Sequence, residues 1–272
     1  MYFVTDKTNK IMILRRLGSK LKIAKKIQTH FPKHKVYVEP FFGAGGMFFN
    51  KPKAKYNIVN DLDSDVFNLF QVVMNQKEEL EKAFYIMPIH SDLLEYWKKN
   101  EETEPIKKAL RFLFLSNLTF MGAGASIQAG LGNTKESFYK MINPTFEMIN
   151  DVKFFNKDFR KFFSCLAIGE KNDINPNEAF IYSDSPYLDT DDNYSHSFTE
   201  QDSFDLFEAN QKTGCKWAMS EFNNPFILDQ AKERGLNVIT IGERQNLKNR
   251  RIEILVTNYE NAQMSIFEPC NQ

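Results

Sequence analysis

Hydrophobic and polar positions along the chain fall into two kinds of segment. Short apolar runs rich in β-branched residues predict strands. These runs are Lys35–Pro40, Tyr56–Asp61, Phe180–Asp184, Lys216–Ser220, Asn237–Ile241, Glu253–Tyr259 and Gln263–Phe267. Segments with helical periodicity lie at Ser19–Phe31, Ser64–Phe84, Pro105–Leu115, Glu200–Lys212 and Pro225–Arg234. Because strands and helices alternate, we expect an α/β fold with a mostly parallel sheet covered by helices on both faces.

Two stretches depart from this alternation. The last two predicted strands follow each other closely, which predicts an antiparallel hairpin at one edge of the sheet. Residues 85–163 contain no clear strand and predict an inserted, largely helical subdomain. We therefore expect one discontinuous domain formed by residues 1–84 and 164–272, with the insertion 85–163 between its two parts.

The composition is that of an ordinary globular protein. Hydrophobic residues make up 42% and charged residues 26% of the 272 residues, and no apolar run approaches the roughly 20 residues that cross a bilayer. The N-terminus lacks the features of a secretion signal. Cys165, Cys215 and Cys270 are not grouped with histidines at metal-ligand spacing. These features predict a cytoplasmic protein with no membrane association and no metal.

The net charge of zero, from 35 basic and 35 acidic residues, gives no indication about a nucleic-acid partner. The distribution of charge is more informative. Basic residues are concentrated between Lys7 and Lys35, and a second group lies in a polar loop predicted between two strands. This second group consists of Arg244, Lys248, Arg250 and Arg251. Phosphate contact is one interpretation of either group, and a solvated surface is the more common one.

The first candidate site follows a predicted strand and has the sequence EPFFGAGG, from Glu39 to Gly46. Glycines there let the backbone turn tightly and approach a ligand at the end of the sheet. The spacing differs from the dinucleotide-binding fingerprint. Asp61 ends the next strand, where its carboxylate can accept hydrogen bonds from ribose hydroxyls. The alternative for Asp61 is a cap on the helix near Ser64, although Asp63 is better placed for that role. Together the loop and Asp61 indicate an adenosine-containing ligand.

The second candidate site, Asp184-Ser185-Pro186-Tyr187, also follows a strand directly. A carboxylate and a backbone carbonyl that accept the two hydrogens of an adenine amine would localise its lone pair and oppose the developing positive charge. Asp184 and the carbonyl of Ser185 fit these roles. Pro186 fixes the turn, and the Tyr187 ring offers a stacking face for a flipped base. An acidic strand end before a proline turn also occurs without any chemical role, so the interpretation depends on the glycine loop and Asp61.

The ordered motifs VEPFFGAGG, VNDLDSD, YSDSPY, SFT and ILVTNY resemble those of the Dam-type (D12 class) adenine-specific DNA methyltransferases of bacteria and phages. The similarity extends from about Arg15 to Tyr259. It implies a Rossmann-like seven-stranded sheet, S-adenosylmethionine as methyl donor with S-adenosylhomocysteine as product, and base flipping out of double-stranded DNA. It also implies that residues 1–84 and 164–272 bind the cofactor and perform catalysis, while residues 85–163 recognise the target sequence.

The resemblance carries specific roles to residues of this chain. The catalytic residues it implies are Asp184, Ser185, Pro186 and Tyr187. The cofactor-binding residues it implies are Gly18, Lys20, Glu39, Pro40, Phe41, Phe42, Gly43, Gly45, Asp61 and Asp184. The substrate-binding residues expected are Tyr187, Phe198, Tyr259, Asn117 and Arg250. For Thr199, which follows Phe198, the presence of Asp202 three residues later favours a helix cap over a role in the site.

The chain departs from the family pattern in two places. Ser185 stands where the family tetrapeptide usually has proline; because the chemistry uses the carbonyl of this residue, we expect the reaction type to be retained. The segment Leu115–Gly122 lacks the arginine that the GATC-specific enzymes use at DNA. We therefore do not expect GATC specificity. The glycine-rich segment 122–133 is either a DNA-approaching loop or a plain surface loop.

Several alternatives remain open at this point. RNA adenine, the cytosine amine and a glutamine side chain are methylated on related folds, but Asp184 and the insertion favour DNA adenine. Methylation of a cytosine ring carbon requires a nucleophilic cysteine in a context absent here. A degenerate, non-catalytic DNA-binding homologue and a nicotinamide-dependent oxidoreductase are the remaining alternatives. A cognate restriction endonuclease is a conceivable partner in the cytoplasm of a bacterial or phage-infected cell. Direct displacement of the methyl group requires no metal.

Overall fold

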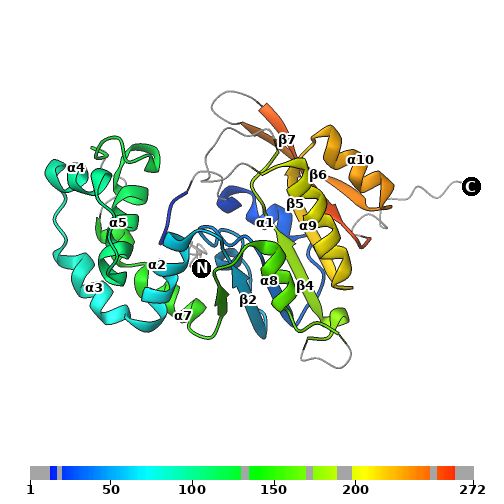
Figure 1. Ribbon diagram of the computed structural model, residues 1–272, viewed down its shortest axis with the longest axis horizontal. Coiled ribbons are helices and arrows are strands. Elements are labelled where there is room, and N and C mark those ends of the chain that lie inside the picture. Colours follow the sequence, from blue (N-terminus) through cyan, green and yellow to red (C-terminus); the bar gives the residue numbers. More distant parts are fainter. Residues whose placement is uncertain are drawn as a thin grey trace, which may run out of the picture. The chain divides into compact units, whose positions relative to one another are not determined.

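The computed structural model describes residues 13–16, 20–129, 135–169, 174–188, 198–245 and 250–260. The chain divides into two compact units (Figure 1). The helical unit comprises Met1–Lys22, Gly43–Pro52 and Ser64–Asp151, and the α/β unit comprises Ile23–Phe42, Lys53–Asp63 and Val152–Gln272. Each unit is therefore assembled from separate stretches of sequence.

The α/β unit is built on a seven-stranded sheet with the order β3-β2-β1-β4-β5-β7-β6. Its strands are β1 (Val36–Glu39), β2 (Tyr56–Asn60), β3 (Lys153–Phe155), β4 (Ala179–Ser183), β5 (Lys216–Phe222), β6 (Asn237–Gln245) and β7 (Arg250–Thr257). Strands β1 to β5 pair in parallel, while β7 is antiparallel to both β5 and β6. The predicted mostly parallel sheet with antiparallel C-terminal strands is confirmed.

The antiparallel hairpin consists of different strands from those expected. It joins β6 to β7, whereas the sequence predicted a pairing of Glu253–Tyr259 with Gln263–Phe267. The segment Gln263–Phe267 lies outside the described residues. The polar loop predicted before Glu253 is also wrong in large part, because Arg244 pairs with Arg251 inside the hairpin. Strand β6 lies at the edge of the sheet, where charged side chains are tolerated. This part of its sequence therefore lacks the apolar run that marks a buried strand.

Strand β3 was not predicted. It has three residues and lies at the other edge of the sheet, where Ile58 of β2 is in register with Lys153. The prediction that residues 85–163 contain no strand is therefore wrong at this point. A strand of this length offers too few positions for an alternating pattern to be recognised.

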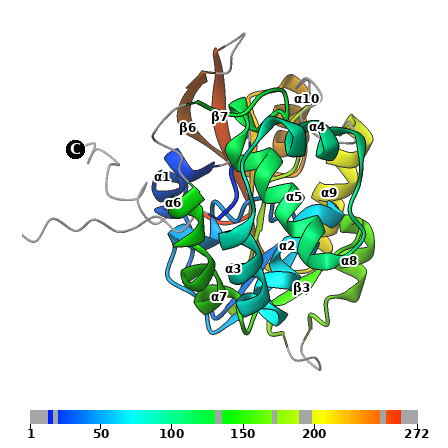
Figure 2. The ribbon, with the colours of Figure 1, turned by 90° about the vertical axis from the view of Figure 1, so that its left-hand side faces the viewer.

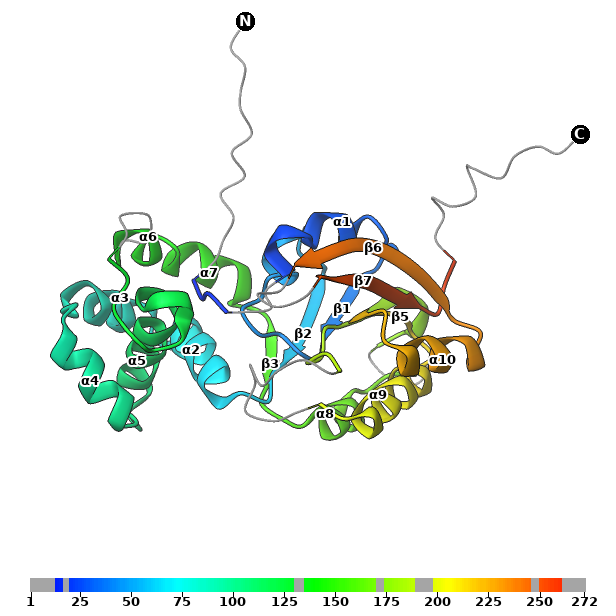
Figure 3. The same ribbon diagram turned by 90° about the horizontal axis from the view of Figure 1, so that it is seen from above.

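Helices cover both faces of the sheet, as predicted (Figure 3). Helix α1 (Ala24–Gln28) lies on one face, and α8 (Phe159–Cys165), α9 (Glu200–Lys212) and α10 (Pro225–Glu233) lie on the other. Successive residues of a strand point to opposite faces. The core between the sheet and these helices includes Val36, Val38, Ile58, Ile181, Trp217 and Met219 from the strands and Leu206, Phe207 and Ile227 from the helices. Strand β1 is buried along its whole length, which accounts for the run of hydrophobic residues Val36–Val38 before Glu39.

The helical unit contains α2 (Ser64–Asn75), α3 (Lys77–Ile86), α4 (Ser91–Lys99), α5 (Pro105–Leu118), α6 (Lys135–Tyr139) and α7 (Ile142–Ile149) (Figure 2). Helix α5 packs against α2 and α3. It begins with Pro105, and Glu104 accepts hydrogen bonds from the first backbone amides. The helix predicted over Ser64–Phe84 is interrupted at Gln76, whose backbone leaves the helical region at φ −141° and ψ 41°.

The limits of the two units differ from the predicted domain boundaries. Helix α2 and most of α3 precede residue 85 but belong to the helical unit, because they pack against α5. Residues 152–163 belong to the α/β unit, because β3 pairs with β2. The roles assigned to the two parts stay predictions. The shorter 3-10 helices are Lys20–Lys22, Phe48–Asn50, Phe120–Gly122 and Pro176–Glu178. Across the described residues, no helix combines the length and apolar character needed to cross a membrane.

Candidate active site

The sheet has a switch point between β1 and β4. From β1 the chain continues outward through β2 to β3, while β4 and β5 extend the sheet in the other direction. Open α/β sheets bind ligands at the carboxyl ends of their strands at such a point. Val38 is in register with Ile181 on the neighbouring strand, so Glu39 and Asp184 follow at the same edge. The structure thus brings the two constellations predicted from sequence to one edge of the sheet.

The glycine loop is held by a buried asparagine that sequence analysis did not identify. The side-chain amide of Asn60 donates to the carbonyl of Pro40 at 3.0 Å and to that of Lys157 at 2.9 Å. Its oxygen accepts from the amide of Lys157 at 3.0 Å. The amide of Phe42 also donates to the backbone carbonyl of Asn60. Asn60 therefore joins the end of β1 to the segment after β3. The sequence signal was a polar residue at the last position of an apolar strand.

Gly43 has a backbone conformation that favours glycine. Its φ of +54° lies in the left-handed region, and a Cβ atom at this position would have no heavy atom within 4 Å. The backbone is therefore open to close approach, which is the role predicted for this loop. Gly45 also has a positive φ, of 70°. Pro40 precedes these residues and connects them to Glu39, whose side chain is buried.

Asp61 lies at the carboxyl end of β2, as predicted. Its carboxylate accepts a hydrogen bond from the amide of Asp63 at 2.9 Å. Its backbone amide donates a hydrogen bond to the carbonyl of Phe155, and its backbone carbonyl accepts one from the side-chain amide of Asn156 at 2.8 Å. These contacts fix the position of Asp61 at the edge of the sheet. Its ribose-binding role stays a prediction.

Three phenylalanine rings form an aromatic cluster beside the loop after β1. The ring centroids of Phe41 and Phe159 are 5.6 Å apart, and Phe198 lies 6.1 Å from Phe41 and 6.0 Å from Phe159. Phe198 was predicted at the substrate, and the structure brings it to the predicted cofactor residue Phe41. Phe159 was not identified from sequence. The next residue, Thr199, forms a capping box with Asp202 at the start of α9, which confirms the cap interpretation.

The tetrapeptide after β4 is packed against the antiparallel strands. Ser185 and Tyr187 are 4% and 8% exposed, so only a small part of the Tyr187 ring is open. The Tyr187 hydroxyl donates to Glu253 Oε1 at 2.5 Å and lies 3.3 Å from Asp184 Oδ1. The ring meets Phe222 edge-on with centroids 4.7 Å apart. Neither Glu253 nor Phe222 was identified from sequence, since Glu253 appears there as an ordinary strand residue and Phe222 lies beyond the predicted strand Lys216–Ser220.

Tyrosine hydroxyls and carboxylates share one face of the sheet beneath this edge. The Tyr37 hydroxyl donates to Glu39 at 2.8 Å, and the Tyr182 hydroxyl is 2.7 Å from that of Ser220. Burial raises the pKa of Tyr37, and the charge of Glu39 raises it further. Burial likewise raises the pKa values of Tyr182 and Tyr187, with a further contribution from Asp184. All three hydroxyls therefore stay protonated at neutral pH, and those of Tyr37 and Tyr187 donate hydrogen bonds to carboxylates.

Two predicted substrate residues, Asn117 and Tyr259, have hydrogen-bond partners that sequence analysis did not identify. Asn117 is buried in α5 of the helical unit, where its side chain donates to Ile13 and accepts from the amide of Arg15. Tyr259 follows β7 beside the first residues of β5, at the opposite edge of the sheet, and donates to the carbonyl of His30. The roles predicted for Asn117 at DNA and for Tyr259 in a base pocket stay predictions, and the structure shows that both side chains form hydrogen bonds within the protein. Sequence alone did not show which way these side chains point.

The remaining predicted residues are placed as follows. Arg250 is the first residue of β7 and pairs with Gln245 in the hairpin. Lys20 is buried at the start of the first 3-10 helix. Gly18 lies outside the described residues. Within the described part of the chain, no group of three or more histidine, cysteine or acidic residues is arranged to hold a metal ion.

The sequence profile of the D12 class N6 adenine-specific DNA methyltransferases matches residues 17–261. The chain belongs to this family. This adenine methyltransferase is 26% identical to the DNA adenine methylase of Vibrio cholerae, over 93% of this chain and 86% of the relative. It is 27% identical to the DNA adenine methylase of Escherichia coli K12, over 64% of each chain. It is 25% identical to a type II methyltransferase of Lactococcus lactis, over 90% of this chain and 94% of the relative.

Among solved structures, an rRNA methyltransferase from Streptomyces viridochromogenes matches with a TM-score of 0.37 and 10% identity, covering 87% of this chain and 84% of that chain. The fold assignment rests on the strand order and pairing described above. The family assignment gives the reaction: S-adenosylmethionine-dependent methylation of the N6 amine of adenine in DNA. It favours DNA adenine over the RNA, glutamine and non-catalytic alternatives.

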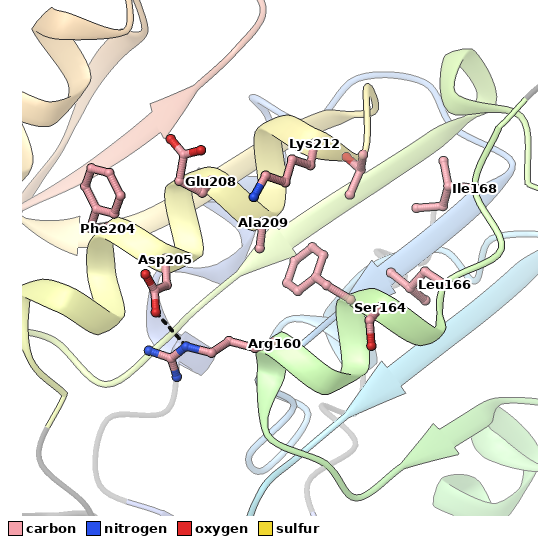
Figure 4. A pocket seen from close by; sticks show the side chains of 11 residues that line it. Arg160, Ser164, Leu166, Ile168, Phe204, Asp205, Glu208, Ala209 and Lys212 are labelled. Carbon is pink, nitrogen blue, oxygen red and sulfur yellow. Dashed lines mark hydrogen bonds and ion pairs between the residues drawn. The ribbon is translucent and has the colours of Figure 1, made fainter.

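A groove of about 580 Å³ lies between α8 and α9, apart from the tetrapeptide (Figure 4). Arg160 lies at one end and forms ion pairs with Asp202 and Asp205. Figure 4 shows Phe204 and Lys212 on the α9 side of the groove. None of the predicted site residues lines it. The candidate active site is therefore the edge formed by the strand ends, and not this groove.

Proposed function

We propose that Asp184 and the backbone carbonyl of Ser185 hold the exocyclic amine of a target adenine during methyl transfer. The carboxylate accepts one amine hydrogen and the carbonyl accepts the other. These two acceptors draw the nitrogen lone pair out of conjugation with the ring. The carboxylate also stabilises the positive charge that develops on nitrogen during attack. The position of Asp184 at the switch point, beside the strand end that carries the glycine loop, is the observation that supports this assignment.

Tyr187 and Pro186 complete the proposed catalytic segment. Pro186 restricts the backbone after Ser185 and so limits the directions in which the carbonyl can point. The Tyr187 ring stacks on the flipped base along the part of its surface that is open. Its packing against Phe222 and its hydroxyl contacts support a fixed ring orientation. Ser185 in place of proline should leave the reaction type unchanged, because the chemistry uses the backbone carbonyl of this residue.

The residues around the switch point fit the proposed cofactor. S-adenosylmethionine, when bound, supplies an electrophilic methyl group on its sulfonium sulfur. The open, left-handed backbone at Gly43 permits close approach, and the Asp61 carboxylate is suited to accept hydrogen bonds from ribose hydroxyls. The rings of Phe41, Phe159 and Phe198 offer an apolar surface for an adenine ring. We assign Gly18 and Lys20 to the same site on the family resemblance alone.

The DNA substrate is proposed to be double-stranded, with the target adenine flipped out of the helix. Recognition of the target sequence is proposed for residues 85–163 within the helical unit, and contact with phosphate for Arg250. The resemblance to a type II methyltransferase supports a cognate restriction endonuclease as partner. Action on DNA is consistent with the cytoplasm of a bacterial or phage-infected cell. A direct displacement needs no metal, and none is proposed.

The test incubates the purified protein with methyl-labelled S-adenosylmethionine and unmethylated duplex DNA of mixed sequence, followed by nucleoside analysis. We expect label in N6-methyladenine. The variant Asp184→Ala should lose transfer by at least about 1000-fold and retain cofactor affinity, because the carboxylate acts on the amine. Asp229→Ala, which removes an exposed carboxylate of α10, is the matched control and should keep the wild-type rate.

The possible outcomes test the proposed substrate separately from the proposed role of Asp184. Label in RNA or protein instead of DNA would contradict the proposed substrate. Wild-type turnover in Asp184→Ala would contradict the role of the carboxylate while leaving the substrate assignment intact. Sequencing of the methylated DNA would then supply the recognition site.

A further inference from the structure

The first residues of β7 lie beside the catalytic tetrapeptide. Glu253 pairs with Phe222 at the end of β5, which is the edge where β4 delivers Asp184. Alternate residues of a strand point to the same face. Arg251 and Glu253 therefore share one face of β7, and both contact the segment from Tyr187 to Leu188.

Glu253 makes the central contact of this arrangement. Its side chain is 1% exposed, and its Oε1 atom accepts the hydrogen of the Tyr187 hydroxyl at 2.5 Å. A buried carboxylate is costly unless hydrogen-bond donors satisfy it. The burial of Glu253 is therefore not explained by packing alone. Its contact with a residue of the tetrapeptide connects it to the active site.

The surrounding residues restrain the same segment. The Arg251 guanidinium lies over the Phe222 ring, 5.4 Å from its centroid, and donates to the carbonyl of Leu188 at 3.4 Å. The buried carboxylate of Glu221 accepts hydrogen bonds from the backbone amides of Leu188 at 3.3 Å and Phe222 at 2.8 Å. The backbone after Tyr187 is thus held from β5 and from β7. The hydrogen bond from the Tyr187 hydroxyl to Glu253 also restrains the orientation of the Tyr187 ring.

We propose that Glu253 is a positioning residue for methyl transfer, which fixes the Tyr187 ring by accepting its hydroxyl hydrogen. This inference rests on the proposed stacking role of Tyr187. A hydroxyl has one hydrogen to donate. With Glu253 at 2.5 Å and Asp184 at 3.3 Å, the hydrogen goes to Glu253. Glu253 thereby keeps Tyr187 from using the Asp184 acceptor that the adenine amine requires.

The test compares four variants in steady-state methylation of unmethylated duplex DNA: Tyr187→Phe, Glu253→Ala, Glu253→Gln and the double variant Tyr187→Phe/Glu253→Ala. Tyr187→Phe keeps the ring and removes only the hydroxyl. Glu253→Gln keeps a carbonyl acceptor for that hydroxyl and removes the charge. The matched control is Glu178→Gln, at the amino end of β4, where the carboxylate pairs with Lys35 at the surface.

We expect kcat to fall about tenfold in Tyr187→Phe and in Glu253→Ala, with the double variant no slower than either single variant. In Glu253→Gln the retained acceptor should keep kcat within about threefold of the wild type. The KM for S-adenosylmethionine should stay within about twofold in all variants, and Glu178→Gln should match the wild type.

Three results would overturn the proposal. Effects that multiply to about a hundredfold in the double variant would show that Glu253 does not act through Tyr187. Equal loss in Glu253→Gln and Glu253→Ala would show that the charge matters and not the acceptor. A parallel loss of cofactor affinity would show a general structural role. If Glu253→Ala does not fold, the Tyr187→Phe variant tests the proposal instead. Wild-type kcat in that variant would exclude any role of the hydroxyl and would overturn the proposal.

The proposed function is tested separately from this inference. Loss of activity in Asp184→Ala together with wild-type kcat in Tyr187→Phe would keep the reaction mechanism and reject the role of Glu253. Transfer of label to a substrate other than DNA would reject the proposed function before these variants are compared.

Discussion

Asn60 illustrates how a single buried polar side chain can set the shape of the proposed cofactor site. It is 1% exposed, and its amide satisfies the carbonyls of Pro40 and Lys157 and the amide of Lys157. These backbone groups belong to two loops that are distant in sequence. Their geometry therefore depends on one residue that itself is not expected to touch the ligand.

The variant Asn60→Ala should lose about 2–3 kcal/mol of unfolding free energy, because it leaves buried backbone groups without partners. It should also weaken S-adenosylmethionine binding, since Pro40 leads into the glycine loop. Urea denaturation and calorimetric titration measure the two effects. Asn223→Ala, at an exposed position before α10, should change stability by less than about 0.5 kcal/mol. Unchanged cofactor affinity in Asn60→Ala would contradict the positioning role.

The candidate residues that sequence located at the edge of the sheet share one property: they lie at the end of a strand or directly after it. Glu39, Asp61 and Asp184 are located by the end of an apolar run, and parallel strands end at the same edge of the sheet. Asn117 and Tyr259 were assigned by resemblance, with no local pattern that shows the direction of the side chain. Glu253 was missed because a carboxylate in a strand usually points to solvent, and only the pairing of β5 with β7 shows its burial.

At the scale of elements, hydrophobic patterning located the strands that are buried on both faces. It did not find β3, which is too short to show a period, or the outer part of the β6–β7 hairpin, where Arg244 pairs with Arg251. It also joined α2 to α3, because the break at Gln76 leaves the apolar spacing on either side nearly unchanged. Polar capping signals were more informative about where α9 begins.

The capping box at the start of α9 gives a prediction for that element. Thr199→Ala removes the side-chain acceptor for the amide of Asp202 and the partner of its carboxylate. It should lower the unfolding free energy by about 1 kcal/mol, which corresponds to a decrease of about 2–4 °C in Tm for a chain of this size. Thr199→Ser keeps the hydroxyl and should stay within a few tenths of a kcal/mol. Equal Tm values for the two variants, measured by calorimetry, would contradict the cap.

At the scale of the whole molecule, the sequence predicted one inserted helical part in an α/β protein, and the structure divides the chain differently. Helix α2, which precedes residue 85, belongs to the helical unit because it packs against α5. Such packing partners are long-range properties, which a periodicity within one segment does not contain. The order of motifs nevertheless identified the family, because the glycine loop, Asp61 and the tetrapeptide each follow a different strand.

The buried tyrosines predict how the stability of the molecule depends on pH. Burial raises the pKa values of Tyr37, Tyr182 and Tyr187 well above the ordinary value near 10, and that of Tyr259 is raised by the same cause. The folded state therefore binds these protons more tightly than the unfolded state. The corresponding stability is fully present below about pH 10 and is lost as the pH rises further.

We expect the contribution of these tyrosines to the free energy of unfolding to be constant between about pH 7 and 9 and to fall steeply above about pH 10. The urea midpoint measures this change. Each tyrosine that ionises only on unfolding adds up to about 1.4 kcal/mol per pH unit to this slope. Tyr182→Phe removes one such group and should reduce the slope by that amount, although it also loses the contact with Ser220 and lowers stability at pH 7. Tyrosinate absorbance during the same titration provides the check, because the buried hydroxyls should ionise together with unfolding. Complete ionisation of all tyrosines in a chain that is still folded would show that these hydroxyls are accessible, and it would contradict the buried, hydrogen-bonded arrangement of Tyr37, Tyr182 and Tyr187.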